Sequence, residues 1–131
     1  MSQWRWLAAS ALFASAAFAH HQFASEYDQN KPMTLTGTIQ SVQWNDPHVH
    51  FTLDVKNQSG KQEMWTLETA KPEYLKDHGA LRSMFKKGEN ITVSAYGATK
   101  EANVASARMI TFADGKTIQV ADPSEDGGPA K

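Results

Sequence analysis

Residues 48–55 read His-Val-His-Phe-Thr-Leu-Asp-Val, and this stretch decides the fold class. Its apolar residues stand at positions 49, 51, 53 and 55, and polar residues occupy the positions between them. Alternation with a period of two predicts a β-strand that has one face in the core and one face in water. His48 and His50 therefore leave the strand on the same polar face, roughly 7 Å apart along the chain.

The segments around this strand predict a small β-barrel. A first strand is expected over residues 33–44, with a bulge near Gln40-Ser41 because the apolar register shifts there. A turn over residues 57–60 leads to a third strand over 62–69. Pro72 begins a helix and Gly79 ends it.

Two further strands are expected at residues 91–95 and 104–112. A turn then leads to a short segment at 117–120 that runs back along the last strand. The order β-β-β-α-β-β with a bulged first strand predicts a mainly β fold, an OB-like five-stranded barrel with one short helix. An open meander with the helix on one face is the alternative architecture.

Residues 1–19 have the pattern of a secretory leader. Arg5 supplies positive charge, an apolar run follows over 6–18, and Ala17-Phe18-Ala19 forms a cleavage site. A cut after Ala19 makes His20 the first mature residue, whereas a cut after Ala17 would leave Phe18 there. The expected organisation is a signal peptide (1–19), a lead-in with His20 and His21 (20–32), an OB-like barrel (33–121) and a disordered tail (122–131).

Composition narrows the class of protein further. Cleavage leaves 112 of the 131 residues, which is enough for one domain. The mature chain carries 12 basic and 14 acidic residues, so nucleic acid is not an expected partner. It has no cysteine, which excludes disulfides and thiolate ligands. It has no second hydrophobic segment, so we expect no membrane span after cleavage and predict a periplasmic location.

The histidines suggest a metal site. An N-terminal His20 offers its α-amine and its imidazole to one ion, and an extended lead-in could carry it across a small barrel. We therefore expect His20, with His48 or His50 and with His21 in reserve, to bind a metal. Nitrogen ligands without sulfur favour Cu(II). Asp46, Asp54 and Glu68 are candidate carboxylates for orienting an imidazole, although a plain surface charge is the favoured interpretation of each. His78 is expected to complement a helix end.

No pattern for catalysis is found, so no catalytic residue is assigned. The sequence has no phosphate-binding glycine loop and no nucleophile elbow. The leading hypothesis is a non-catalytic periplasmic copper-binding protein, which could also contact a periplasmic protein partner. The alternative is a metal-free OB-fold module that binds a small ligand, a glycan or a protein. An oxidative copper enzyme is a third, less favoured class.

Several short motifs together resemble one family. They are Ala19-His20-His21-x-Phe23, Tyr27-Asp28, Leu35-x-Gly37-Thr38, Trp44-x-x-Pro47-His48, Trp65-x-x-Glu68 and Asp114-Gly115. The combination resembles a family of small exported bacterial proteins catalogued as a domain of unknown function. The resemblance implies export and a shared place for His20, His21 and His48, but no activity. Members usually have Asn-Pro-His where this chain has Asp46-Pro47-His48. The strand order is also similar to that of periplasmic OB-fold proteins.

Overall fold

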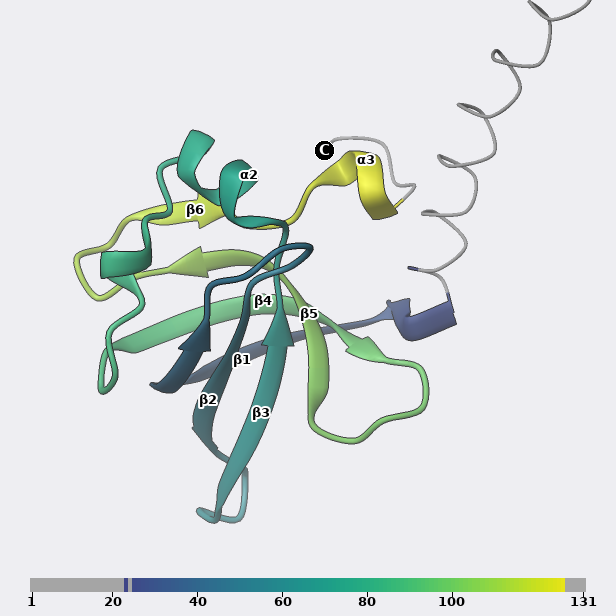
Figure 1. Ribbon diagram of the computed structural model, residues 1–131. Coiled ribbons are helices and arrows are strands. Elements are labelled where there is room, and N and C mark those ends of the chain that lie inside the picture. Colours follow the sequence, from purple (N-terminus) through teal and green to yellow (C-terminus); the bar gives the residue numbers. More distant parts are fainter. Residues whose placement is uncertain (1–22, 24, 127–131) are drawn as a thin grey trace, which may run out of the picture.

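The computed structural model describes residues 23 and 25–126, and these residues fold around one closed sheet (Figure 1). Its elements are β1 (Tyr27–Gln43), β2 (His50–Lys56), β3 (Gln62–Glu68), α2 (Pro72–Asp77), the 3-10 turn η2 (Arg82–Met84), β4 (Asn90–Ala98), β5 (Val104–Thr111), β6 (Thr117–Gln119) and α3 (Pro123–Asp126).

The sheet closes on itself. Its strand order is β3-β2-β1-β4-β5-β6, and a parallel pairing of β3 with β5 joins the two sides. Five strands thus form a ring, and β6 is an added short strand on β5. The mainly β, OB-like fold expected from the sequence is therefore confirmed, and the open meander is not found.

Strand β1 is long and bends, so it pairs with two neighbouring strands. It pairs with β2 through its second half and with β4 through most of its length. The register against β2 shifts between Ile39 and Ser41, where the bulge was predicted. Gly37 lies at the close approach of β1 and β2, because a Cβ there would overlap the backbone oxygen of Asp54. Glycine therefore permits the tight wrapping of β1.

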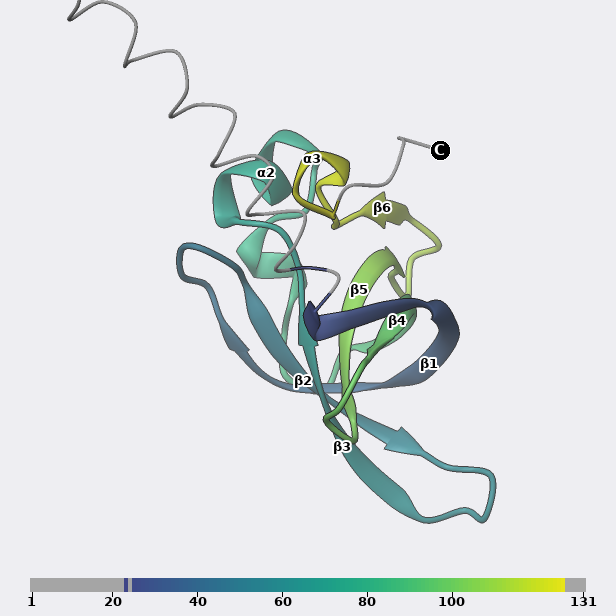
Figure 2. The same cartoon turned by 90° about the vertical axis from the view of Figure 1, so that its right-hand side faces the viewer.

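Apolar faces of the strands fill the barrel. The predicted core positions of residues 48–55 are confirmed, since Val49, just before β2, and Phe51 and Leu53 of β2 are at most 1% exposed, and Val55 is 7% exposed. Leu75 of α2 is fully buried and closes one end. Both views show α2, β6 and α3 together at this end, whereas the β2–β3 hairpin projects from the other (Figures 1 and 2).

Two expected boundaries need correction. β1 begins at Tyr27 rather than at residue 33, so residues 27–32 of the lead-in belong to the barrel. Backbone pairing with β4, such as Tyr27 with Ala98, holds this polar stretch although no apolar alternation marks it. Within the tail, residues 123–126 form the turn α3, where Asp122 accepts a hydrogen bond from the Ser124 amide at 3.0 Å.

No helix within residues 23 and 25–126 is both long enough and apolar enough to cross a membrane.

Candidate functional site

The two central histidines stand at the start of β2. His50 is the first residue of the strand and pairs with Glu68, the last residue of β3. Val49 continues this pairing by one residue, because its amide donates to Ala70 at 3.2 Å and its carbonyl accepts from Thr69 at 2.9 Å. Consequently His48, though just outside the strand, follows the same alternation and faces the side that His50 faces.

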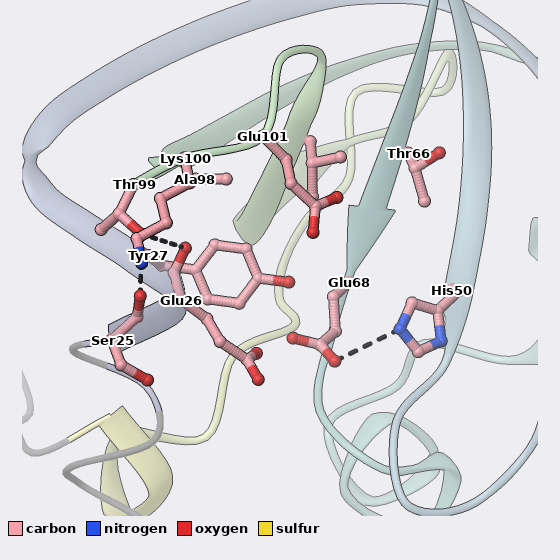
Figure 3. Close-up of a pocket in the computed structure, with 11 residues that line it drawn as sticks. Ser25, Glu26, Tyr27, His50, Thr66, Glu68, Ala98, Thr99, Lys100 and Glu101 are labelled. Atoms are coloured by element: carbon pink, nitrogen blue, oxygen red, sulfur yellow. Dashed lines mark hydrogen bonds and ion pairs between the residues drawn. The ribbon is translucent and has the colours of Figure 1, made fainter.

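Glu68 joins the two imidazoles. Its Oε1 lies 3.3 Å from Nδ1 of His48 and 3.2 Å from Nε2 of His50. The Glu68 side chain is 20% exposed, whereas those of His48 and His50 are 27% and 41% exposed. One partly buried carboxylate thus lies beside both imidazoles, so Glu68 is not simply a surface charge, and Figure 3 shows its contact with His50. No ion pair among the described residues links Asp46 or Asp54 to either ring.

Tyr27 lies beside this cluster at the start of β1. Burial raises the pKa of its phenol, and the charge of Glu68 and a side-chain hydrogen bond with Glu68 raise it further. Figure 3 shows its hydroxyl pointing toward Glu68 and Glu101. Tyr27 therefore stays neutral and ties the first strand to the carboxylate that the histidines share.

The C-terminal turn supplies a second carboxylate. Oε2 of Glu125, on α3, lies 3.3 Å from Nε2 of His48. Burial raises the pKa of Glu125, and the neighbouring His48 acts in the opposite direction. His48 therefore has a carboxylate at each ring nitrogen, one from β3 and one from α3.

Several hollows adjoin these side chains, and two of them are large. The larger, of about 530 Å³, is lined by Tyr27, His50 and Glu68 and by the β4–β5 connection, including Thr99 and Glu101. The smaller, of about 310 Å³, is lined by Phe23, Glu26, Tyr27, Pro47, His48, Glu68 and Glu125. Because Tyr27 and Glu68 line both, the two hollows meet at the carboxylate between the histidines.

Phe23 is where the described N-terminal segment contacts the barrel. The guanidinium carbon of Arg108 lies 5.4 Å from the centre of the Phe23 ring, and the centre of the Tyr27 ring is also 5.4 Å from it. A cation–π contact and an aromatic contact therefore hold Phe23 in the hollow that His48 lines.

The remaining predicted histidines lie elsewhere. His20 and His21 fall outside the described residues. His78 follows the last residue of α2, contacts the Tyr74 carbonyl oxygen at 2.8 Å through Nδ1 and stacks on the Tyr74 ring. Over residues 23 and 25–126, no three or more His, Asp or Glu side chains form a group that could hold a metal by themselves.

Sequence reasoning missed Tyr27 and Glu125 as parts of the site. Tyr27 belongs to one of the motifs that carry the family resemblance. The residues after it are polar, so no alternating pattern predicted that Tyr27 begins a strand. Glu125 lies in a polar, proline-containing tail whose local pattern gives no sign of a contact with His48.

Comparison with known proteins supplies the family but no activity. A search of curated proteins finds no significant match. Among solved structures, the mitochondrial single-stranded DNA-binding protein Rim1 from S. cerevisiae is similar, with 14% identity, a TM-score of 0.45, and coverage of 63% of this chain and 93% of that one. The family of unknown function DUF6152 matches residues 9–107. Since this match covers most of the sequence, the chain belongs to the DUF6152 family.

Proposed function

We propose that this protein is exported to the periplasm and binds Cu(II) through the amine and imidazole of His20 together with His48. The observation that carries the proposal is the convergence of His48 and His50 on Glu68, next to the point where the N-terminal segment reaches the barrel. Metal-binding histidines commonly donate their second ring N–H to a carboxylate, which fixes the tautomer and orients the ring. Glu68 can do this for either histidine.

The path of the chain favours His48 over His50. Ser25 lines the hollow that contains His50, Glu26 lines both hollows, and Phe23 lines the hollow that contains His48. Moving toward the N-terminus, the chain therefore passes His50 first and reaches His48 next. His20 stands three positions before Phe23, so it lies at most about 10 Å from Phe23 along an extended chain. That length allows His20 to enter the hollow that Phe23 and His48 line, and His21 follows it in the sequence as a further donor.

The surroundings suit a cation. Glu26, Glu68 and Glu125 all line the hollow beside His48, so a divalent ion enters a region of negative potential. Imidazole and amine nitrogens favour Cu(II) over the other divalent first-row ions. Both kinds of nitrogen must lose their protons to bind, so copper affinity should fall in acid.

A titration of three histidine variants tests this proposal. The mature protein, with His20 confirmed as its first residue by mass spectrometry, is titrated with Cu(II) against a competing chelator. His48→Ala should lower the affinity by about a hundredfold or more, because it removes a direct ligand. His50→Ala should have a smaller effect. His78→Ala is the matched control, since His78 is engaged with Tyr74 and should leave affinity unchanged. Equal affinities for all three variants would contradict the proposal.

The larger hollow favours a second candidate function. Its volume of about 530 Å³ and its mixture of carboxylates, hydroxyls and the Tyr27 ring suit a small polar ligand held without metal. In that case a Thr66→Trp change, which would fill the hollow from an exposed position on β3, should abolish ligand binding and leave copper affinity intact. A screen of small metabolites by thermal shift, with and without a metal chelator, separates the two functions.

A further inference from the structure

We infer that a groove beside α2 binds a small carboxylate that carries an apolar group. The groove has a volume of about 330 Å³ and is lined by Trp44, Pro72, Glu73, Lys76, Leu81 and Arg82. It shares no lining residue with the two large hollows beside the histidines. The inference therefore goes beyond the proposed function and requires no metal.

Trp44 forms a fixed apolar wall of this groove. It directly follows the last residue of β1 and belongs to the motif Trp44-x-x-Pro47-His48. The centre of its ring lies 5.5 Å from that of Phe85 in an edge-to-face arrangement, and Phe85 contacts Phe51 inside the barrel. The indole is therefore held from the core side, and its groove side remains for a ligand.

Leu81 forms a second apolar wall. This residue is 48% exposed, although hydrogen bonds hold the backbone around it. The Leu81 carbonyl accepts from the Met84 amide at 2.9 Å, and the amide of Ala80 donates to the Leu75 carbonyl at 2.8 Å. A leucine side chain thus faces water at a fixed position in the groove that Trp44 lines. An apolar group that covers both side chains removes their surface from water, which favours binding.

Two cations stand at the same groove. Lys76 lies on α2, and Arg82 is the first residue of η2. Every ion pair between described residues involves a histidine, so neither cation has a carboxylate partner among them. The lining contains one acidic residue, Glu73, and its net charge is therefore +1. The planar guanidinium of Arg82 offers paired N–H donors that match the two oxygens of a carboxylate.

The charge distribution of the barrel favours an anion at this end. Residues 71–89 contain five basic and three acidic residues, whereas the other described residues contain six basic and eleven acidic ones. With neutral histidines, the formal charges of the two sets are +2 and −5. An anionic ligand is consequently attracted to the segment with α2 and η2 and repelled by the hollows that Glu26 and Glu68 line.

The groove also selects the kind of anion. A strongly hydrated ion such as phosphate would lose water against Trp44 and Leu81 without gaining polar contacts there. A carboxylate with a phenyl or branched aliphatic group places its charge at Arg82 and its apolar part on those two side chains. The groove volume lies at the lower end of the range for small-molecule sites, about 300–1,000 Å³. A protein partner would need about 800 Å² of contact surface, which a groove of six residues does not supply.

NMR titration of the ¹⁵N-labelled protein with hydrocinnamate tests the inference. The ligand should shift the indole resonance of Trp44 and the amide resonances of Leu81 and Arg82 in a saturable manner. Hydrocinnamamide, which has the same shape without the charge, should bind at least about tenfold more weakly. Arg82→Gln should weaken hydrocinnamate binding by a similar factor. Lys86→Gln is the matched control, because Lys86 is an exposed cation of the same segment that does not line the groove, and it should change the affinity by less than about twofold.

Three results would overturn the inference. Equal affinities for the acid and its amide would show that the groove does not recognise a carboxylate. Equal losses for Arg82→Gln and Lys86→Gln would show that only net charge matters. If hydrocinnamate shifts none of these resonances while vesicles of phosphatidylglycerol broaden them, the groove contacts a membrane surface instead. The copper titrations depend on none of these residues, so the proposed function stands or fails separately.

Discussion

Replacing Glu68 by glutamine tests whether one carboxylate organises the site. Glu68→Gln keeps the size of the side chain and one acceptor oxygen, but it removes the charge that lies 3.2–3.3 Å from both imidazoles. Loss of such an orienting partner typically costs 10–100-fold in metal affinity, or about 1.4–2.7 kcal/mol. The exposed fractions of 27% and 41% for His48 and His50 allow water to screen the interaction. We therefore expect a loss near the lower end, about tenfold.

The assay is a competition titration with Cu(II) at neutral pH, and Glu101→Gln is the control. Glu101 lines the same larger hollow, but no ion pair within the described residues links it to an imidazole. It should therefore leave affinity within about twofold of the original protein, a difference of about 0.4 kcal/mol. An unchanged affinity for Glu68→Gln, or an equal fall for both variants, would refute the assignment of Glu68 as the orienting group.

Three further predictions concern the barrel. Above pH 10 the phenol of Tyr27 ionises in the unfolded chain but keeps its proton in the folded protein, because its pKa is raised there. The free energy of unfolding should therefore fall with rising pH, and its slope should exceed that of Tyr27→Phe by about 1.4 kcal/mol per pH unit. Parallel pH profiles of the two proteins in urea denaturation would disprove this. Phe51→Ala should cost about 3–5 kcal/mol by denaturant unfolding, whereas Met64→Ala, at a side chain that is 50% exposed, should cost less than about 0.5 kcal/mol. Gly37→Ala should lower the free energy of unfolding by about 3 kcal/mol or more, because the new Cβ would overlap the backbone of Asp54. Gly60→Ala should lower it by about 1 kcal/mol, because only the positive φ of residue 60 is unfavourable there. Equal losses for the two variants would argue against the close approach of β1 and β2.

Local patterns were sufficient to predict most of the barrel. The alternation of residues 48–55 identified the buried face of β2, and the register shift identified the bulge between Ile39 and Ser41. Pro72 and Gly79 marked the ends of α2, because each has a fixed role at a helix terminus. These features depend on neighbours in the sequence, so a single sequence reveals them.

The site itself depends on contacts between distant segments. The pairing of His50 with Glu68 follows from the β2–β3 hairpin, so its register could have been counted from the turn at 57–60. The contact of His48 with Glu125 has no such local origin, because it depends on how β6 returns the chain to the end of the barrel near α2. The first residues of β1 were missed for a related reason: backbone pairing with β4 places them, not their side-chain pattern.

The most direct test of the copper proposal compares two forms of residues 20–131 that differ at one end. One form begins at His20, and the other carries one additional methionine before it. We predict that the form beginning at His20 binds Cu(II) at least about a hundredfold more tightly, because the extension removes the chelate that the amine and the imidazole of one residue form. Equal affinities, with the same EPR spectrum in both forms, would contradict an ion anchored at the first residue.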